Sequence, residues 1–247
     1  MTNLWLAAAL TLGGVLLPAA FALAAEFQAP DGAPPLVHWA FLESVDGKMG
    51  DMQRYAVENV APEVKNEPGT FALYGGVDSS KPNRLCLLEI YQDENAYERH
   101  VGSAAFAKYR ELRAPILKEL VVTPVESIAL EQKTSGFGTR LVIRRYEVDP
   151  ERREEYCRLA RAEAKRAVER EEKTLGVFVT AEEENPHIFR TLEVYADEEG
   201  LQARRDSKEW KAWRETVGCW ESAVEEIDVK DAKVPLSVKG TILPDAR

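Results

Sequence analysis

The sequence has few of the residues that build metal, redox and nucleotide sites. Its 247 residues include three histidines and three cysteines, and no CxxC, HxH or HxxxH spacing occurs, so we predict no metal site. GxGxxG, Walker and nucleophile-elbow patterns are also absent, and no cofactor is expected from such motifs. Basic residues are outnumbered, with 32 Lys and Arg against 42 Asp and Glu. The net charge of -10 makes nucleic acid an unexpected partner.

Charged residues are missing from the N-terminus, where Glu26 is the first. The apolar run 4–25 ends in Ala22-Leu23-Ala24-Ala25, and such small residues are typical of a signal peptidase site. We predict a signal peptide over 1–25, cleaved before Ala25 or Glu26, a linker over 26–35, and export to the periplasm or the extracellular space. The alternative is an uncleaved membrane anchor over 4–25, since about 20 apolar residues can span a bilayer. Only in that case would the membrane be a partner.

An odd number of cysteines cannot pair completely within one exported chain. We predict that Cys86, Cys157 and Cys219 are buried small residues. One disulfide among them is the alternative, and the sequence does not choose the pair.

An internal repeat is the most informative feature of the sequence. A shift of 104 residues places Leu88-Glu89-Ile90-Tyr91 on Leu192-Glu193-Val194-Tyr195 and Phe106 on Trp210. Near the start the offset is expected to become 105, through a single-residue indel that aligns Leu36-Val37 with Leu141-Val142. We predict two homologous domains, 36–130 and 139–230, followed by a C-terminal tail, 231–247.

The hydrophobic periodicity predicts the same elements in each domain. Strands are expected at 36–43 and 141–148, then helices over 49–64 and 156–168. Hairpins follow, formed by strands 70–77 and 84–91 in the first domain and 174–181 and 188–195 in the second. A second helix is expected over 106–120 or 210–217, and a last strand over 121–130 or 222–229. The order is β-α-β-β-α-β, the ferredoxin-like arrangement of an α+β protein.

The first domain carries a set of motifs that extends over most of its length. These are Glu67-Pro68-Gly69-Thr70, Asp78 to Asn83, Leu87 to Tyr91, Tyr97 to His100, Ser103 and Phe106. In this pattern the sequence resembles the antibiotic biosynthesis monooxygenase (ABM) family. The second domain keeps Glu193-Val194-Tyr195, Ser207 and Trp210, but it lacks the Glu-Pro-Gly turn and has Arg204 in place of His100. The resemblance covers almost all of the mature chain.

The resemblance implies a dimeric α+β barrel, which the tandem domains would form within one chain. The two domains would supply eight strands, a number that leaves an interior just wide enough for side chains or one small ligand. Further oligomerisation is left open.

The resemblance and the strand alternation together give candidate site residues. Alternation places Leu85, Leu87, Glu89 and Tyr91 on one strand face. We predict His100, Tyr91 and Glu89 as catalytic groups: an acid-base His, an aromatic phenol and a buried carboxylate. The predicted substrate pocket comprises Leu85, Leu87, Tyr74, Phe106, Tyr195 and Glu193. The structural alternatives are a rim aromatic for Tyr91, an ion pair for Glu89 and a turn-capping hydrogen bond for His100.

The resemblance implies a cofactor-independent monooxygenase that acts on a small aromatic or quinol. Haem degradation, the chemistry of one branch, is disfavoured because no Asn lies in 36–43 or 141–148 and Arg110 stands where that branch has its His. The alternative function is a non-catalytic barrel that binds a small hydrophobic ligand or serves in assembly. Convergence of His100, Tyr91 and Glu89 on one cavity would favour the enzyme. We expect the chemistry in the first domain, since Arg204 stays protonated and cannot act as a base.

Overall fold

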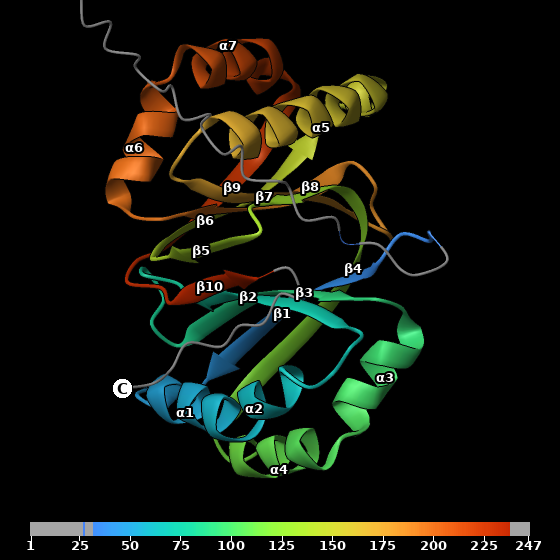
Figure 1. Ribbon diagram of the computed structural model, residues 1–247, viewed down its shortest axis with the longest axis vertical. Coiled ribbons are helices and arrows are strands. Elements are labelled where there is room, and N and C mark those ends of the chain that lie inside the picture. The colour runs from blue at the N-terminus through green and yellow to red at the C-terminus, as the bar shows by residue number, and fades with distance from the viewer. Residues whose placement is uncertain (1–26, 28–31, 238–247) are drawn as a thin grey trace, which may run out of the picture.

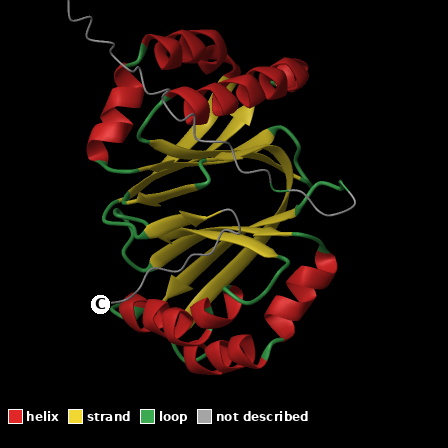
Figure 2. Cartoon of the chain, viewed as in Figure 1, coloured by secondary structure: helices red, strands yellow, loops and turns green. Residues whose placement is uncertain are grey.

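The computed structural model describes Phe27 and residues 32–237. The predicted signal peptide lies outside the described residues, as do half of the linker and the last ten residues of the tail. The chain forms four layers, with the two halves of a curled sheet packed face to face and helices on both outer faces (Figures 1 and 2). In the described part, no helix is long and apolar enough to cross a membrane.

The first unit has the predicted β-α-β-β-α-β order, with two of its helical segments divided. Its elements are β1 (Leu36–Ser44), α1 (Met49–Asn59), α2 (Ala61–Val64), β2 (Thr70–Val77), β3 (Arg84–Tyr91), α3 (Glu94–Gly102), α4 (Ala104–Arg113) and β4 (Leu117–Gln132). The prediction of a helix through Leu120 is wrong, because Pro115 follows the end of α4 and Leu117 already begins β4.

The second unit repeats this order. Its elements are β6 (Arg140–Val148), the 3-10 turn η1 (Pro150–Arg152), α5 (Arg153–Arg170), β7 (Thr174–Glu182), β8 (Ile188–Tyr195), α6 (Glu198–Asp206), α7 (Lys208–Val217), the 3-10 turn η2 (Gly218–Trp220) and β9 (Glu221–Val229). Helix α5 is continuous where the first unit divides at Pro62, because the repeat-equivalent residue is Arg166, a good helix former.

The strand register corrects the predicted indel. Leu36 lies opposite Tyr91 in the first unit, and Arg140 lies opposite Tyr195 in the second. Leu36 is therefore equivalent to Arg140, and the offset is already 104 in the first strand. The prediction of an offset of 105 is wrong, because similar apolar residues on adjacent positions of two strands can be aligned in either register.

The two units share one eight-stranded sheet, in the order β2-β3-β1-β4-β7-β8-β6-β9. Strand β4 joins them, because Val125 pairs with Val37 of β1 on one side and Glu182 of β7 on the other. The outer strands approach each other where the amide of Ser79 donates to the carbonyl of Asp228 at 2.8 Å. The expected tandem α+β barrel within one chain is therefore confirmed.

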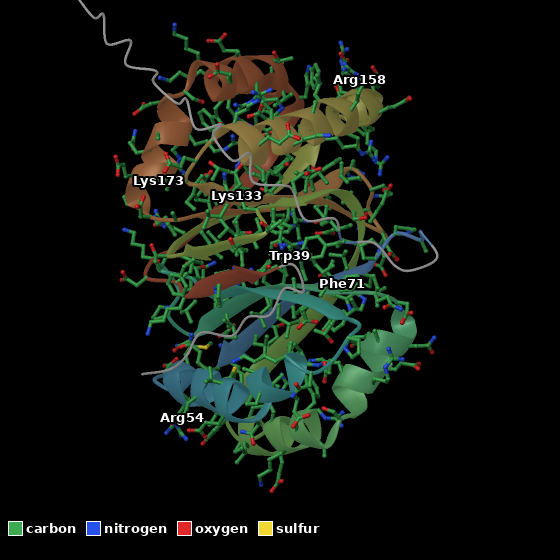
Figure 3. All side chains as sticks on the ribbon, viewed as in Figure 1. Trp39, Arg54, Phe71, Lys133, Arg158 and Lys173 are labelled. Atoms are coloured by element: carbon green, nitrogen blue, oxygen red, sulfur yellow. The ribbon has the colours of Figure 1, made fainter. Side chains whose placement is uncertain are left out.

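Side chains fill the barrel interior. Trp39, which is fully buried, lies between the two halves of the sheet (Figure 3), and its Nε1 donates to Thr180 Oγ1 at 3.0 Å. The hydroxyl of Tyr74 donates to Gln132 Oε1 at 2.7 Å inside the same core. The prediction of Tyr74 as a pocket residue is wrong, because strand alternation turns it toward the barrel and away from the helices.

A small second sheet lies beside the main one and was not predicted. Strands β5 (Ser135–Gly138) and β10 (Val234–Ser237) pair antiparallel between the two units (Figure 1). Val234 and Leu236 are buried in the barrel core. This part of the predicted tail is therefore a structural strand.

The three cysteines are unpaired, and their burial differs from the prediction. Cys86 and Cys157 are buried, as expected, but Cys219 is exposed. It lies in η2, between α7 and β9, where Trp220 packs on the core and Cys219 does not.

Candidate active site

A cavity of about 280 Å³ lies between the sheet of the first unit and its helices. Six of the predicted residues line it: Leu85, Leu87, Glu89, Tyr91, His100 and Phe106. The three predicted catalytic side chains therefore converge on one cavity. The remaining wall is mostly apolar, from Ala40, Leu42, Ala56, Val60, Leu73, Val101, Leu120 and Val122.

Local sequence places these groups. In β3, alternate side chains face the helices, which brings Glu89 and Tyr91 to the cavity side. The Asp93 side chain caps α3, and the Ser103 side chain accepts the Phe106 amide and caps α4. The bend between these two caps turns His100 and Phe106 toward the same space, and their rings meet edge to face at 5.1 Å.

His100 is held by the half-buried carboxylate of Glu67. Its Nδ1 lies 2.8 Å from Glu67 Oε2, and the ring is 3% exposed. Glu67 also accepts a hydrogen bond from the Thr70 hydroxyl at 2.7 Å, so we assign the proton of this contact to Nδ1. Nε2 then carries the lone pair of the imidazole, as in a carboxylate–histidine pair that serves a general base.

Glu89 and Tyr91 form a second polar pair at the cavity wall. The Tyr91 hydroxyl donates to Glu89 Oε2 at 3.3 Å. Burial raises the pKa of Glu89 to about 7, while the hydrogen bond from Tyr91 and the charge of Arg113 act in the opposite direction. Burial also raises the pKa of Tyr91, so this phenol stays protonated and can donate to an oxygen of a ligand.

Sequence reasoning missed four residues that complete the site. Tyr97, Tyr109 and Arg113 line the cavity, and Glu67 orients His100. The Arg113 guanidinium lies over the rings of Tyr109 at 4.7 Å and Phe106 at 5.7 Å. Helical spacing gave a signal for Tyr109 and Arg113, which lie three and seven residues after Phe106 and so share its face.

His38 lies beside the site and packs as a neutral ring. It is buried, meets Tyr97 edge to face at 4.9 Å, and its Nδ1 has no hydrogen-bond partner among the described residues. Burial lowers its pKa, which disfavours the charged form.

In the second unit a charged network occupies the equivalent place. Arg204, 1% exposed, contacts Glu171 at 3.1 Å, Glu163 at 3.2 Å and Glu193 at 3.5 Å. The Tyr195 hydroxyl donates to Glu193. Tyr195 and Glu193, predicted as part of the substrate pocket, do not line the cavity of the first unit, because each unit packs its own helices on its own part of the sheet.

The second unit keeps a cleft of about 440 Å³ at the repeat-equivalent place, where Glu193, Trp210 and Trp213 stand for Glu89, Phe106 and Tyr109. Its lining is more charged. Arg144 occupies the position of Ala40 and contacts Glu221 at 2.8 Å, and Arg214 contacts the same carboxylate at 2.6 Å. In the described part of the chain, no group of His, Cys, Asp and Glu could hold a metal ion.

Comparison with known proteins gives the family. The model of the antibiotic biosynthesis monooxygenase (ABM) family matches residues 37–112 and again 139–216. The chain belongs to the ABM family. It carries two tandem copies of the domain, as the sequence predicted.

Solved structures share the fold over most of the chain. A candidate monooxygenase from Lactobacillus acidophilus NCFM is 17% identical, with a TM-score of 0.76, and the match covers 86% of this chain and 100% of that one. A candidate monooxygenase from Fusobacterium nucleatum is 18% identical, with a TM-score of 0.75, covering 85% and 97%. An anthrone oxidase-like protein is 10% identical, with a TM-score of 0.54, covering 86% and 97%. These similarities show the fold. No curated protein matches the chain.

Proposed function

We propose that the first unit is a cofactor-independent monooxygenase that acts on a small aromatic or quinol. The observation that carries the proposal is that His100, Glu89 and Tyr91 line one apolar cavity, with His100 oriented by Glu67. The cavity volume of about 280 Å³ is at the lower end of small-molecule sites, which span roughly 300–1,000 Å³. It therefore suits a substrate of one or two rings.

The residues have distinct roles in this proposal. His100 Nε2 removes a proton from the substrate, and Glu67 stabilises the resulting imidazolium. Tyr91 donates a hydrogen bond to the substrate oxygen as negative charge develops there. The rings of Phe106, Tyr97 and Tyr109 hold the aromatic body and exclude water, which strengthens these polar contacts.

The chemistry balances without a cofactor. The deprotonated substrate gives one electron to O₂, and the substrate radical and superoxide combine through a new C–O bond into a peroxide anion. This anion takes the first proton back from His100 and becomes C–OOH. Loss of the second proton from that carbon breaks the O–O bond, so one oxygen atom stays as C=O and the other leaves as water. The substrate loses two hydrogen atoms and gains one oxygen atom, and O₂ is the oxidant. The anthrone oxidase-like neighbour supports an aromatic substrate class.

Oxygen uptake against a panel of phenols and quinols tests the proposal. His100→Ala should lower turnover by about 100-fold or more, because a positioned base typically contributes 10²–10⁴-fold. Mass spectrometry after reaction under ¹⁸O₂ should find one labelled atom in the product.

Arg204→Ala is the matched control, since Arg204 is the repeat-equivalent of His100. It should leave turnover nearly unchanged, with circular dichroism used to select conditions where both variants are folded. Equal turnover in the two variants would remove His100 from the mechanism. No uptake with any substrate would favour the ligand-binding barrel.

A further inference from the structure

A second cavity, of about 560 Å³, opens at one end of the barrel and receives residues from both units. We name it the barrel-mouth cleft, lined by Phe41, Lys81, Arg84, Val121, Arg145 and Arg190. The small sheet of β5 and β10 flanks the start of β6, near Arg140. Arg145 is five residues further along β6, or about 17 Å, so the cleft lies at the end of the barrel away from the small sheet. The catalytic cavity lies on the helix side of the first unit, and Leu42 is the one residue that lines both cavities.

The repeat shows where the second unit adds charge to this cleft. In the 104-residue register, Arg145 is equivalent to Phe41 and Arg190 to Cys86. Phe41 and Cys86 are cross-strand partners in the first unit, and Arg145 and Arg190 are cross-strand partners in the second. Like charges directly opposite each other destabilise a sheet. The arginine pair therefore does not serve the stability of the fold as its apolar counterpart does.

The carboxylates of the cleft are shared between cations. Glu182 contacts both Arg190, at 2.8 Å, and Arg145, at 3.4 Å. Glu225 contacts Arg84 at 3.2 Å and Lys81 at 3.9 Å.

Two further carboxylates line the cleft, Glu43 and Glu119, and Glu43 is engaged by Lys118. Four cations and three carboxylates line the cleft, so its lining has one positive charge in excess, although the whole protein carries a net charge of -10.

Arg145 is only partly engaged by carboxylates. Among the described residues its contact with Glu182 runs through Nε, and neither Nη group has a hydrogen-bond partner. A guanidinium presents its N–H groups as a planar fork that matches two oxygens of a carboxylate or phosphate. The open donors of Arg145 are therefore suited to an oxyanion.

The other wall of the cleft is aromatic. Guanidinium groups lie on the Phe41 ring, Arg84 at 5.2 Å and Arg190 at 4.8 Å, and Phe41 stacks on Trp39 at 6.0 Å. Val121, which is 44% exposed, extends this apolar wall. We propose that the barrel-mouth cleft binds a small organic oxyanion, with its carboxylate or phosphate on Arg145 and Arg190 and its apolar body against Phe41 and Val121.

Calorimetry on the full chain tests this site with three probes of similar size. Benzoate and phenyl phosphate should bind, while benzyl alcohol, their neutral analogue, should not. Comparison of the two anions identifies the preferred headgroup. Binding should weaken as salt is added, because the contact is partly exposed and charged.

Variants locate the bound anion. Arg145→Phe, which restores the residue of the first unit, should lower affinity about tenfold or more and abolish the rise in melting temperature that the anion gives the unmodified protein. Arg158→Gln is the control, since Arg158 lies on α5 at the outer surface (Figure 3) and should leave affinity unchanged.

Arg113→Gln changes the cationic residue of the catalytic cavity and should also leave affinity unchanged. Loss of binding in Arg113→Gln but not in Arg145→Phe would place the anion in the catalytic cavity and overturn the proposal. Equal binding of benzyl alcohol, or no binding of either anion, would overturn it as well. The oxygen-uptake assay is independent of all these outcomes.

Discussion

His100 and its repeat-equivalent, Arg204, lie in similar surroundings but differ in the hydrogen bonds that they can offer a ligand. Both residues end a short helix, and both meet a carboxylate that accepts a threonine hydroxyl: Glu67 with Thr70 in one unit, Glu171 with Thr174 in the other. An imidazole leaves one ring nitrogen for a ligand. A guanidinium has no lone pair to offer, and it draws two further glutamates around itself.

Glu89 gives a pH-dependence that can be checked. Its pKa is raised to about 7 in the folded protein from 4.5, so folding favours the protonated carboxyl. This contribution is fully present below pH 4.5 and is lost as the pH rises through 7, because the unfolded chain then binds fewer protons than the folded one.

Glu89→Gln cannot ionise and should remove this effect. The free energy of unfolding of the variant, relative to the unmodified protein, should rise by about 3 kcal/mol between pH 4.5 and pH 8. Urea titrations at both pH values measure it. A difference that stays constant with pH would show that Glu89 ionises normally in the folded state.

At the scale of elements, each unit packs the turn before its second strand against a helix, and one of the two contacting residues is a glycine. The glycine is in the turn of the first unit and in the helix of the second. A Cβ on Gly69 would lie 2.5 Å from the Ala96 Cβ of α3. In the second unit Lys173 replaces Gly69, and Gly200 of α6 replaces Ala96, with a Cβ there 2.7 Å from that of Lys173. The turn before the second strand can therefore approach the helix closely only when one of the two residues is glycine.

A double-mutant cycle tests this contact. Gly69→Ala should cost about 1–3 kcal/mol through overpacking, and Ala96→Gly about 1 kcal/mol through helix propensity. The double variant should cost only about as much as Ala96→Gly alone, because it has the arrangement of the second unit. Additive losses in denaturant unfolding would mean that the backbone relaxes around the added methyl group without strain.

Strand β10 closes the barrel core and should contribute to stability. Leu236 is buried, so Leu236→Ala should cost about 2–5 kcal/mol. Phe137, on the paired strand β5, is 52% exposed, and Phe137→Ala should change stability by no more than about 0.5 kcal/mol. Chemical denaturation compares the two. Similar small losses would indicate that β10 detaches readily.

At the scale of the molecule, the units share a sheet and a core. Strand β4 belongs to both, and the barrel core combines Trp39, Tyr74 and Phe178 from the two sides. A unit separated from its partner would expose this apolar face and an unpaired strand edge. The two units should therefore unfold together.

Arg204→Ala tests this coupling. Removing one partner of a buried charge network costs about 3–5 kcal/mol, here because Glu163, Glu171 and Glu193 lose their shared cation. The loss should appear as one shifted transition, seen equally by far-UV circular dichroism and by hydrogen exchange in β1–β3. A separate early transition confined to 140–229 would show that the units unfold independently.

The sequence by itself determined the repeat, the order of the elements in each unit and the part of the cavity wall that β3 supplies. Strand period and helix spacing are local properties, so alternation along β3 was enough to bring Glu89 and Tyr91 to the helix side, and the family motif added His100. The prediction of export over 1–25 also rests on the sequence alone.

The tertiary structure decided what depends on distant residues meeting. It turned Tyr74 into the barrel, kept Glu193 and Tyr195 in their own unit, paired Glu67 with His100, and made a strand of 234–237. It also joined Arg145 and Arg190 to Phe41 across the barrel mouth. The hydrophobic periodicity of the sequence does not predict such contacts, because they form only when the two halves of the sheet pack on each other.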